Sequence, residues 1–153
     1  MIEVMIALLA LWVAFNLLAP WAVLAYAEPL SLGRMPAQIA DTVRQLGVRV
    51  YLAQLESPGG FSVIAWPRTV VVFDRASLSR QPAWALRFLM AHELGHCALG
   101  HLAERWWYTV TGLALLPAVQ RRLQRMEREA DRYAERLTGV AAESFYQPKG
   151  VNA

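Results

Sequence analysis

All three histidines of this 153-residue chain lie in one short stretch, HELGHCALGH, which covers positions 92 to 101. Consecutive residues of an α-helix are about 100° apart, so His92 and His96 would share one face, with imidazole rings close enough to hold one ion. Glu93 lies one position further round, where its carboxylate could reach a water on that ion. This HExxH spacing predicts a zinc site, in which two neutral imidazoles bind the metal and the glutamate removes a proton from the zinc-bound water.

The third zinc ligand must come from elsewhere in the chain, and the histidine pair alone could also be an exposed helix face. His101 lies about 180° round a continuous helix from His92, so we interpret it as a capping or interface histidine. Glu127 and Asp131 are four residues apart in the sequence and would share one face of a second helix. One carboxylate could bind zinc while the other accepts a hydrogen bond from a ligating imidazole, although spacing alone does not separate Glu127 from Glu129.

Two helices are predicted to carry these side chains. The first begins at Pro82 and continues through His101, with an apolar stripe formed by Leu86, Leu89, Met90 and Leu94. The second, QRRLQRMEREADRYAERLTG, has apolar residues at helical spacing and ends at Gly139. Its many arginines and acids would also suit a surface helix covered with ion pairs, so the pattern alone leaves both interpretations open.

The segments before the histidine helix predict a small sheet. Residues 37–46 have helical periodicity and end at Gly47, and three stretches rich in β-formers follow at 48–53, 61–66 and 69–73. Turn residues separate these stretches, which favours an antiparallel sheet. The expected fold class is therefore α+β, with a small antiparallel sheet and a helix that carries HExxH.

Residues 4–27 contain no charged side chain. As a helix this segment would be about 36 Å long, enough to cross a hydrocarbon core of about 30 Å, and we interpret it as a transmembrane anchor. A cleaved signal peptide is the rival interpretation, but the N-terminal region of a signal peptide is positively charged, and this chain has Glu3 there. Arginines follow the segment at positions 34, 44 and 49, so the positive-inside rule predicts a single-pass protein of the cell inner membrane with a cytoplasmic domain.

The composition agrees with a membrane-associated chain. Hydrophobic residues make up 56% of the chain and charged residues only 18%, against about 25% in average soluble proteins. Acidic residues are interspersed among the arginines, which argues against a nucleic-acid partner and leaves a lipid bilayer as the expected one. Residues 106–119 form a second apolar run, which is too short to span a bilayer and could be buried, re-entrant or interfacial.

The stretches MAHELGHCALGH and EREADRYAERLTG resemble the HtpX-like family of membrane zinc peptidases, which also includes the CaaX prenyl protease type. The resemblance covers residues 36–139 and implies a zincin-like fold. It also implies Glu93 as the catalytic base and Asp131 as the partner of a ligating histidine. The zinc ligands implied by the resemblance are His92, His96 and Glu127.

The same resemblance implies a polypeptide substrate, which would lie along an edge strand beside the zinc site. Gly60, Phe61 and Ser62 stand where the family often has Asn-Ala-Phe, so they are the predicted substrate-binding residues. The asparagine of that motif is missing in this chain, and the segment between the two zinc motifs is shorter than in the family.

The expected organisation is an anchor at 1–27, a linker at 28–35, a zinc metallopeptidase domain at 36–139 and a tail at 140–153. The expected function is that of a membrane-anchored zinc endopeptidase, with a zinc ion as cofactor and a polypeptide such as a membrane protein as substrate. Two alternatives stay open. One is a membrane adaptor or assembly factor with a structural zinc site, and the other is a regulatory metallopeptidase similar to the ImmA and IrrE type.

Overall fold

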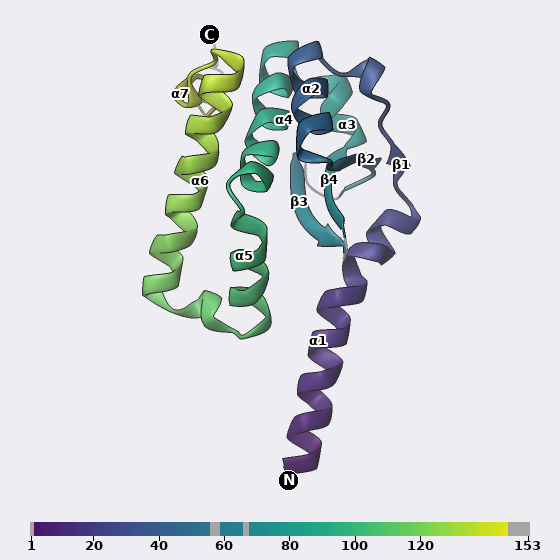
Figure 1. The fold of residues 1–153 in the computed structure, drawn as a ribbon, viewed down its shortest axis with the longest axis vertical. Coiled ribbons are helices and arrows are strands. Elements are labelled where there is room, and N and C mark those ends of the chain that lie inside the picture. Colours follow the sequence, from purple (N-terminus) through teal and green to yellow (C-terminus); the bar gives the residue numbers. More distant parts are fainter. Residues whose placement is uncertain (1, 56–58, 66–67, 147–153) are drawn as a thin grey trace, which may run out of the picture.

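The computed structural model describes residues 2–55, 59–65 and 68–146, and it has one long helix that extends from a helix-rich domain (Figure 1). Helix α1 (Ile2–Ala25) is long and apolar enough to cross a membrane, a property that signal sequences share. Its side chains are mostly exposed in the first half, and Pro20 in the second half is buried.

The sheet of the domain has four strands in the order β1-β2-β4-β3. Strands β3 and β4 pair antiparallel, but β2 pairs with β4 in parallel. The prediction of an antiparallel sheet is therefore wrong, because the sheet is mixed. The bounds of the strands are β1 (Glu28–Pro29), β2 (Arg49–Ala53), β3 (Gly60–Ala65) and β4 (Arg68–Asp74).

The central place of β4 explains the mixed sheet. Its residues Val70, Val71, Val72 and Phe73 are all buried, as expected for a strand that is covered on both faces. Strand β4 lies between β2 and β3, so two strands that follow each other in the sequence do not pair. Turn spacing alone cannot detect this, because it assumes that consecutive strands are neighbours.

The predicted linker at 28–35 belongs partly to the sheet. Strand β1 lies within it and pairs antiparallel with β2, with Glu28 opposite Leu52. A short 3-10 helix, η1 (Leu32–Arg34), follows, and Leu30 between the two is buried in the core. The linker is therefore a structural part of the domain.

The domain also contains shorter helices. Helix α2 (Ala37–Leu46) has the predicted bounds, and Gly47 ends it with a left-handed φ of 63°. Helix α3 (Arg75–Arg80) follows β4 directly and was not predicted. Helix α7 (Ala142–Tyr146) lies in the predicted tail, where the sequence has no clear period.

The predicted histidine helix consists of two helices. Helix α4 (Ala83–Ala98) ends before Gly100, which adopts a φ of 71°, and α5 (His101–Val110) begins directly after it. A side chain at that φ would be strained, so the glycine provides the break. The prediction of one helix through His101 is therefore wrong.

The chain then turns back through a corner, which we define as residues 106–119. The corner contains the end of α5, the 3-10 helix η2 (Leu113–Leu115) and the start of α6 (Pro117–Thr138). Helix α6 lies alongside α4 and α5 and runs in the opposite direction (Figure 1). It ends at the predicted residue, Gly139.

Helices α4 and α6 approach each other closely at Gly95. A Cβ atom added there would lie 3.1 Å from the Tyr133 Cβ and 3.2 Å from the backbone of Ala130. Leu94 and Met126 on either side of this contact are fully buried. The absence of a side chain at Gly95 therefore sets the short distance between the two helices.

Replacing Gly95 by leucine should push α6 away from α4. Overpacking a tight contact costs about 1–3 kcal/mol, and the better helix propensity of leucine, about 1 kcal/mol, opposes this only in part. We expect a lower midpoint of thermal unfolding, followed by circular dichroism of the detergent-solubilised chain. Gly33→Leu is the matched control, because a Cβ at Gly33 meets nothing within 4 Å. An unchanged midpoint for Gly95→Leu would contradict the close packing of α4 on α6.

Candidate metal centre

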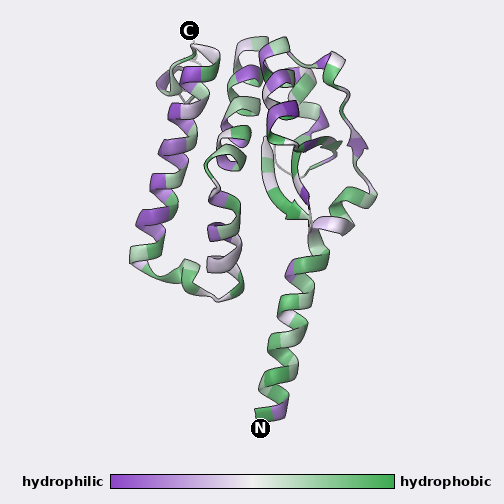
Figure 2. Ribbon diagram, in the orientation of Figure 1, coloured by the Kyte–Doolittle hydropathy of each residue, from purple (hydrophilic) through white to green (hydrophobic). Residues whose placement is uncertain are grey.

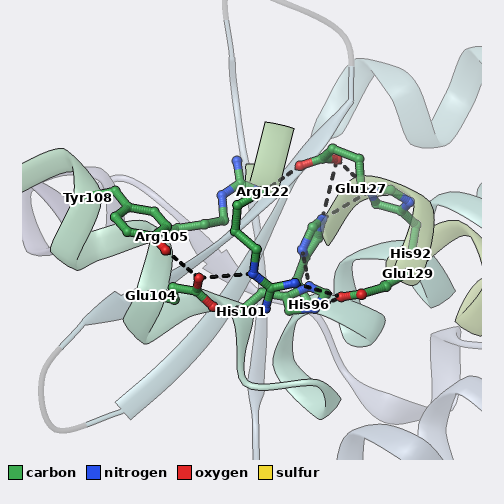
Figure 3. Close-up of polar contacts among 9 residues, drawn as sticks. All are labelled: His92, His96, His101, Glu104, Arg105, Tyr108, Arg122, Glu127 and Glu129. Carbon is green, nitrogen blue, oxygen red and sulfur yellow. Dashed lines mark hydrogen bonds and ion pairs between the residues drawn. The ribbon is translucent and has the colours of Figure 1, made fainter. Parts of the chain in front are cut away.

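Three side chains from two helices converge on one point (Figure 3). His92 and His96 project from α4, and Glu127 projects from α6. The two histidine Nε2 atoms are 3.2 Å apart, and Glu127 Oε2 lies 3.3 Å from His92 Nε2 and 3.5 Å from His96 Nε2. This group could hold a metal ion.

The dimensions of the triangle match those of a tetrahedral metal site. Zinc binds imidazole nitrogen and carboxylate oxygen at about 2.0–2.2 Å, which places any two ligand atoms of a tetrahedron about 3.4 Å apart. The three measured separations of 3.2, 3.3 and 3.5 Å lie close to that value. Three such ligands leave the fourth corner of the tetrahedron to a further group.

Asp131 on α6 fixes the orientation of the His92 ring. Its Oδ1 atom lies 2.9 Å from His92 Nδ1 and also accepts a hydrogen bond of 3.0 Å from the Tyr146 hydroxyl on α7. Because an ionised carboxylate only accepts hydrogen bonds, His92 Nδ1 carries the imidazole proton. His92 Nε2 is then the ring atom that is left to bind a cation.

A longer chain of contacts orients His96. Its Nδ1 atom lies 3.0 Å from His101 Nδ1, and His101 Nε2 lies 3.1 Å from Glu129 Oε2. Because the carboxylate of Glu129 accepts, His101 carries its proton on Nε2 and accepts the proton of His96 on Nδ1. His96 Nε2 is therefore the second ring nitrogen that is left to bind a cation.

The environment of His101 favours this neutral form. Only 2% of the residue is exposed, and burial together with the neighbouring His96 lowers the pKa of His101. Glu129 is held in turn by Arg122, whose Nη1 lies 3.4 Å away and whose Nε and Nη2 reach Glu104 at 3.0 and 2.9 Å. We call His96, His101, Glu129 and Arg122 the His101 relay, which connects α4, α5 and α6 (Figure 3).

The charges of the centre favour a cation. The contacts with His92 and His96 hold the pKa of Glu127 far below its usual range, so its carboxylate is ionised at neutral pH. Burial disfavours a charged His92, but its contact with Glu127 and the charges of Glu93 and Asp131 outweigh burial and raise the pKa of His92. A positive charge is thus stabilised between these side chains, whether a proton or a metal ion supplies it.

Arg105 on α5 limits how Glu127 can bind. Its Nη1 donates a hydrogen bond of 2.9 Å to Glu127 Oε1, the oxygen that faces away from the histidines. Only Oε2 is then directed at the imidazole nitrogens, as a single-oxygen ligand requires. The Glu127 side chain is 46% exposed, so the centre is open to solvent on this side.

Glu93 follows His92 on α4 and is 7% exposed. Its charge is one of several that raise the pKa of His92. Cys97, the residue directly after the motif, packs against the apolar core, and burial raises the pKa of its thiol to about 12. Cys97 is therefore a packing residue.

The three predicted substrate-binding residues lie on β3, at one edge of the sheet. Phe61 and Ser62 pair with Val72 and Val71 of β4. Gly60 packs against the ring of Phe73, with which an added Cβ would clash. The other long side of β3 is turned away from the sheet.

A groove of about 340 Å³ follows β3. Strand β3 forms one wall, and helices α1 and α5 form the others, with Phe61, Ser62, Pro20, Leu102 and Arg105 among the lining residues. Arg105 also contacts Glu127, so this side chain borders both the groove and the candidate metal centre.

A scan against protein-family models found no match to the chain, and a search of the curated proteins found none either. The resemblance to the HtpX-like family therefore rests on the residues of the two motifs. A function has to be inferred from the geometry of the centre.

The structure brings His92, His96 and Glu127 together and places Asp131 beside the first of them. It selects Glu127 over Glu129, which spacing could not do. The sequence did not predict several further residues around the centre. One is His101, which contacts His96, and the others are Arg105, Arg122 and Tyr146. The glycine before His101 is the single sequence signal that could have pointed to that contact.

If the centre holds a metal ion, replacing His101 by phenylalanine should weaken its binding, measured with zinc as the probe ion, by about 10–100-fold, as the loss of a ligand's hydrogen-bond partner usually does. His101→Gln should restore part of the affinity, because its amide can both accept from His96 and donate to Glu129. The affinity is measured by competition with a fluorescent zinc chelator. Arg128→Gln, an exposed change on α6, is the control. A His101→Phe variant that binds zinc as tightly as the unchanged chain would exclude a positioning role for the relay.

Proposed function

We propose that the chain is a membrane-anchored zinc endopeptidase with a zincin-like catalytic domain. The observation that carries the proposal is the triangle of two imidazole nitrogens and one carboxylate oxygen, with the dimensions of a tetrahedral site. Structural zinc sites use four protein ligands, whereas catalytic sites use three and keep one position open. Two histidines and one glutamate are a donor set typical of zinc hydrolases.

Glu93 is the proposed general base. A bound zinc ion supplies Lewis-acid chemistry, which activates a water molecule and polarises the carbonyl group of the peptide bond. Glu93 takes the proton of the attacking water and passes it to the amine of the leaving group. Its place one residue after His92 on α4 supports this role, because a carboxylate there would lie beside a bound ion without being a ligand.

The neighbours of the two histidines hold them ready for this chemistry. Asp131 accepts from His92, and His101 accepts from His96, so both Nε2 atoms are kept in the form that binds metal. Arg105 lines the groove and also contacts Glu127, and the substrate carbonyl would gain negative charge beside the same centre. We assign Arg105 as the side chain that stabilises that charge.

The proposed substrate is a polypeptide that binds in the groove along β3. An edge strand presents backbone N–H and C=O groups that an extended peptide can pair with. Gly60, Phe61 and Ser62 would make these contacts, and Arg105 would mark the end of the groove where the bond is cleaved. A membrane protein suits this groove, because α1 forms one of its walls.

The proposed location is the cell inner membrane. Helix α1 has 24 residues, or about 36 Å, and exceeds the hydrocarbon thickness of about 30 Å. Leu8, Leu11 and Leu18 on this helix are each more than half exposed, as expected for side chains that face lipid. The arginines that follow the helix favour a cytoplasmic domain. A soluble regulator of the ImmA and IrrE type would not need this helix.

The variant Glu93→Gln should keep zinc and lose peptidase activity. Glutamine has nearly the same shape but cannot accept a proton, and general-base catalysis is worth about 10²–10⁴-fold in rate. Zinc content is measured by mass spectrometry of the purified full chain, and cleavage with casein and with a detergent-solubilised membrane protein. Glu143→Gln on the exposed part of α7 is the control. Equal cleavage by the unchanged chain and Glu93→Gln would refute this mechanism.

A hydroxamate inhibitor should bind directly to the metal of this centre. The alternative function, a membrane adaptor or assembly factor with structural zinc, requires a fourth protein ligand and a closed site. We expect the visible absorption spectrum of the cobalt-substituted chain to change when a hydroxamate is added, because the open position accepts it. An absorption spectrum that does not change when the hydroxamate is added would favour the structural site.

A further inference from the structure

The corner at residues 106–119 exposes large apolar side chains that the metal centre does not use. Trp107 is 55% exposed and Leu115 is 86% exposed. The sequence has no charged residue between Arg105 and Arg121. In Figure 2 the turn after α5 and the start of α6 are coloured mostly as hydrophobic, like α1, whereas the end of α5 is nearly white and most of the rest of α6 is hydrophilic. Apolar surface of this kind marks a place where a partner binds.

The corner is attached to the middle of α1. The indole Nε1 of Trp12 donates a hydrogen bond of 2.9 Å to the carbonyl oxygen of Val110, the last residue of α5. At 1.5 Å per residue, Trp12 lies about 20 Å along the helix from Ala25. In a helix that crosses a hydrocarbon core of about 30 Å, this level is well inside the lipid. The end of α5 is at the same level.

Several polar groups in the corner and next to it are bonded within the protein. The hydroxyl groups of Thr109 and Thr111 donate to carbonyl oxygens one turn back, at 2.9 and 2.7 Å. The Gln120 side chain donates to the carbonyl oxygen of Ala114 at 2.5 Å, and the carbonyl of Val110 accepts from α1 as described. A segment that enters lipid needs such internal partners, because the hydrocarbon offers none.

Charged side chains begin directly next to the corner, and two of the arginines there form ion pairs. Arg105 contacts Glu127 at 2.9 Å, and Arg122 contacts Glu104 at 2.9 Å. Arg121 is exposed, and its long side chain can extend toward the lipid head groups. The boundary between apolar and charged residues therefore falls at one level on both α5 and α6.

We propose that the corner inserts into the lipid bilayer beside α1, as a second membrane element that enters one leaflet without crossing it. The proposal rests on the proposed function in one respect, namely that α1 crosses the membrane. It follows that the groove along β3, which α1 and α5 enclose, opens at the surface of that leaflet. The peptide that enters it is then a segment of a membrane protein next to its lipid-embedded part.

The depth of three single cysteine labels in lipid vesicles tests this. The full chain carries Cys97→Ala, and a nitroxide is attached at Leu115→Cys in the corner, Leu9→Cys in α1 or Gln38→Cys on α2. The vesicles contain phosphatidylcholine and phosphatidylglycerol, and the zinc content of each labelled chain checks that the fold is kept. Electron paramagnetic resonance then compares the collisions of each label with oxygen, which concentrates in lipid, and with a nickel chelate, which stays in water.

We expect the label at 115 to favour oxygen over nickel, as the label at 9 does, while the label at 38 favours nickel. A label at 115 that behaves like the one at 38 would overturn the proposal. If the label at 115 is shielded from both reagents and shows spin coupling between chains, a second copy of the chain covers the corner. This result would also overturn the proposal. A label at 9 that favours nickel would refute the anchor itself, whereas the zinc and cleavage measurements on Glu93→Gln test the chemistry separately.

Discussion

The structure depends on one electrostatic constraint, which is that three electron-rich atoms face one another at a single point. The Nε2 atoms of His92 and His96 and a carboxylate oxygen of Glu127 repel each other unless a positive charge lies between them. The fold keeps them together through the close packing of α4 on α6, which Gly95 permits. A site held by backbone packing does not have to be assembled when the ion arrives, and such preorganisation favours both binding and catalysis.

The two histidines are held in different ways. His92 depends on one carboxylate, that of Asp131, which also contacts the C-terminal helix α7 through Tyr146. His96 depends on a second histidine, His101, and on an acid and an arginine behind it. The contacts through His101, Glu129 and Arg122 connect the centre to α5 as well as α6. Helix α5 therefore begins at the candidate metal centre and ends at the apolar corner, so a displacement of the corner would move His101, the partner of His96.

The mixed sheet leaves β3 as an edge strand beside a groove. Because the buried strand β4 takes the central place, β3 is left at the edge that faces α5. Helix α1 supplies another wall of the same groove, with Pro20 buried at the contact. The apolar N-terminal helix thus belongs to the architecture of the groove in addition to being a candidate anchor. Arg105 then joins the groove to Glu127.

The sequence by itself determined the local features, because helix periodicity and glycine stops depend on near neighbours. It placed His92 and His96 on one face, put two acids on one face of a later helix, and ended helices at Gly47 and Gly139. Only the tertiary structure decided which glutamate faces the histidines, that β2 and β4 are parallel, and that His101 supports His96. Each of these depends on the packing of elements that are distant in the sequence. Helical and strand periodicity depends only on near neighbours and does not predict that packing.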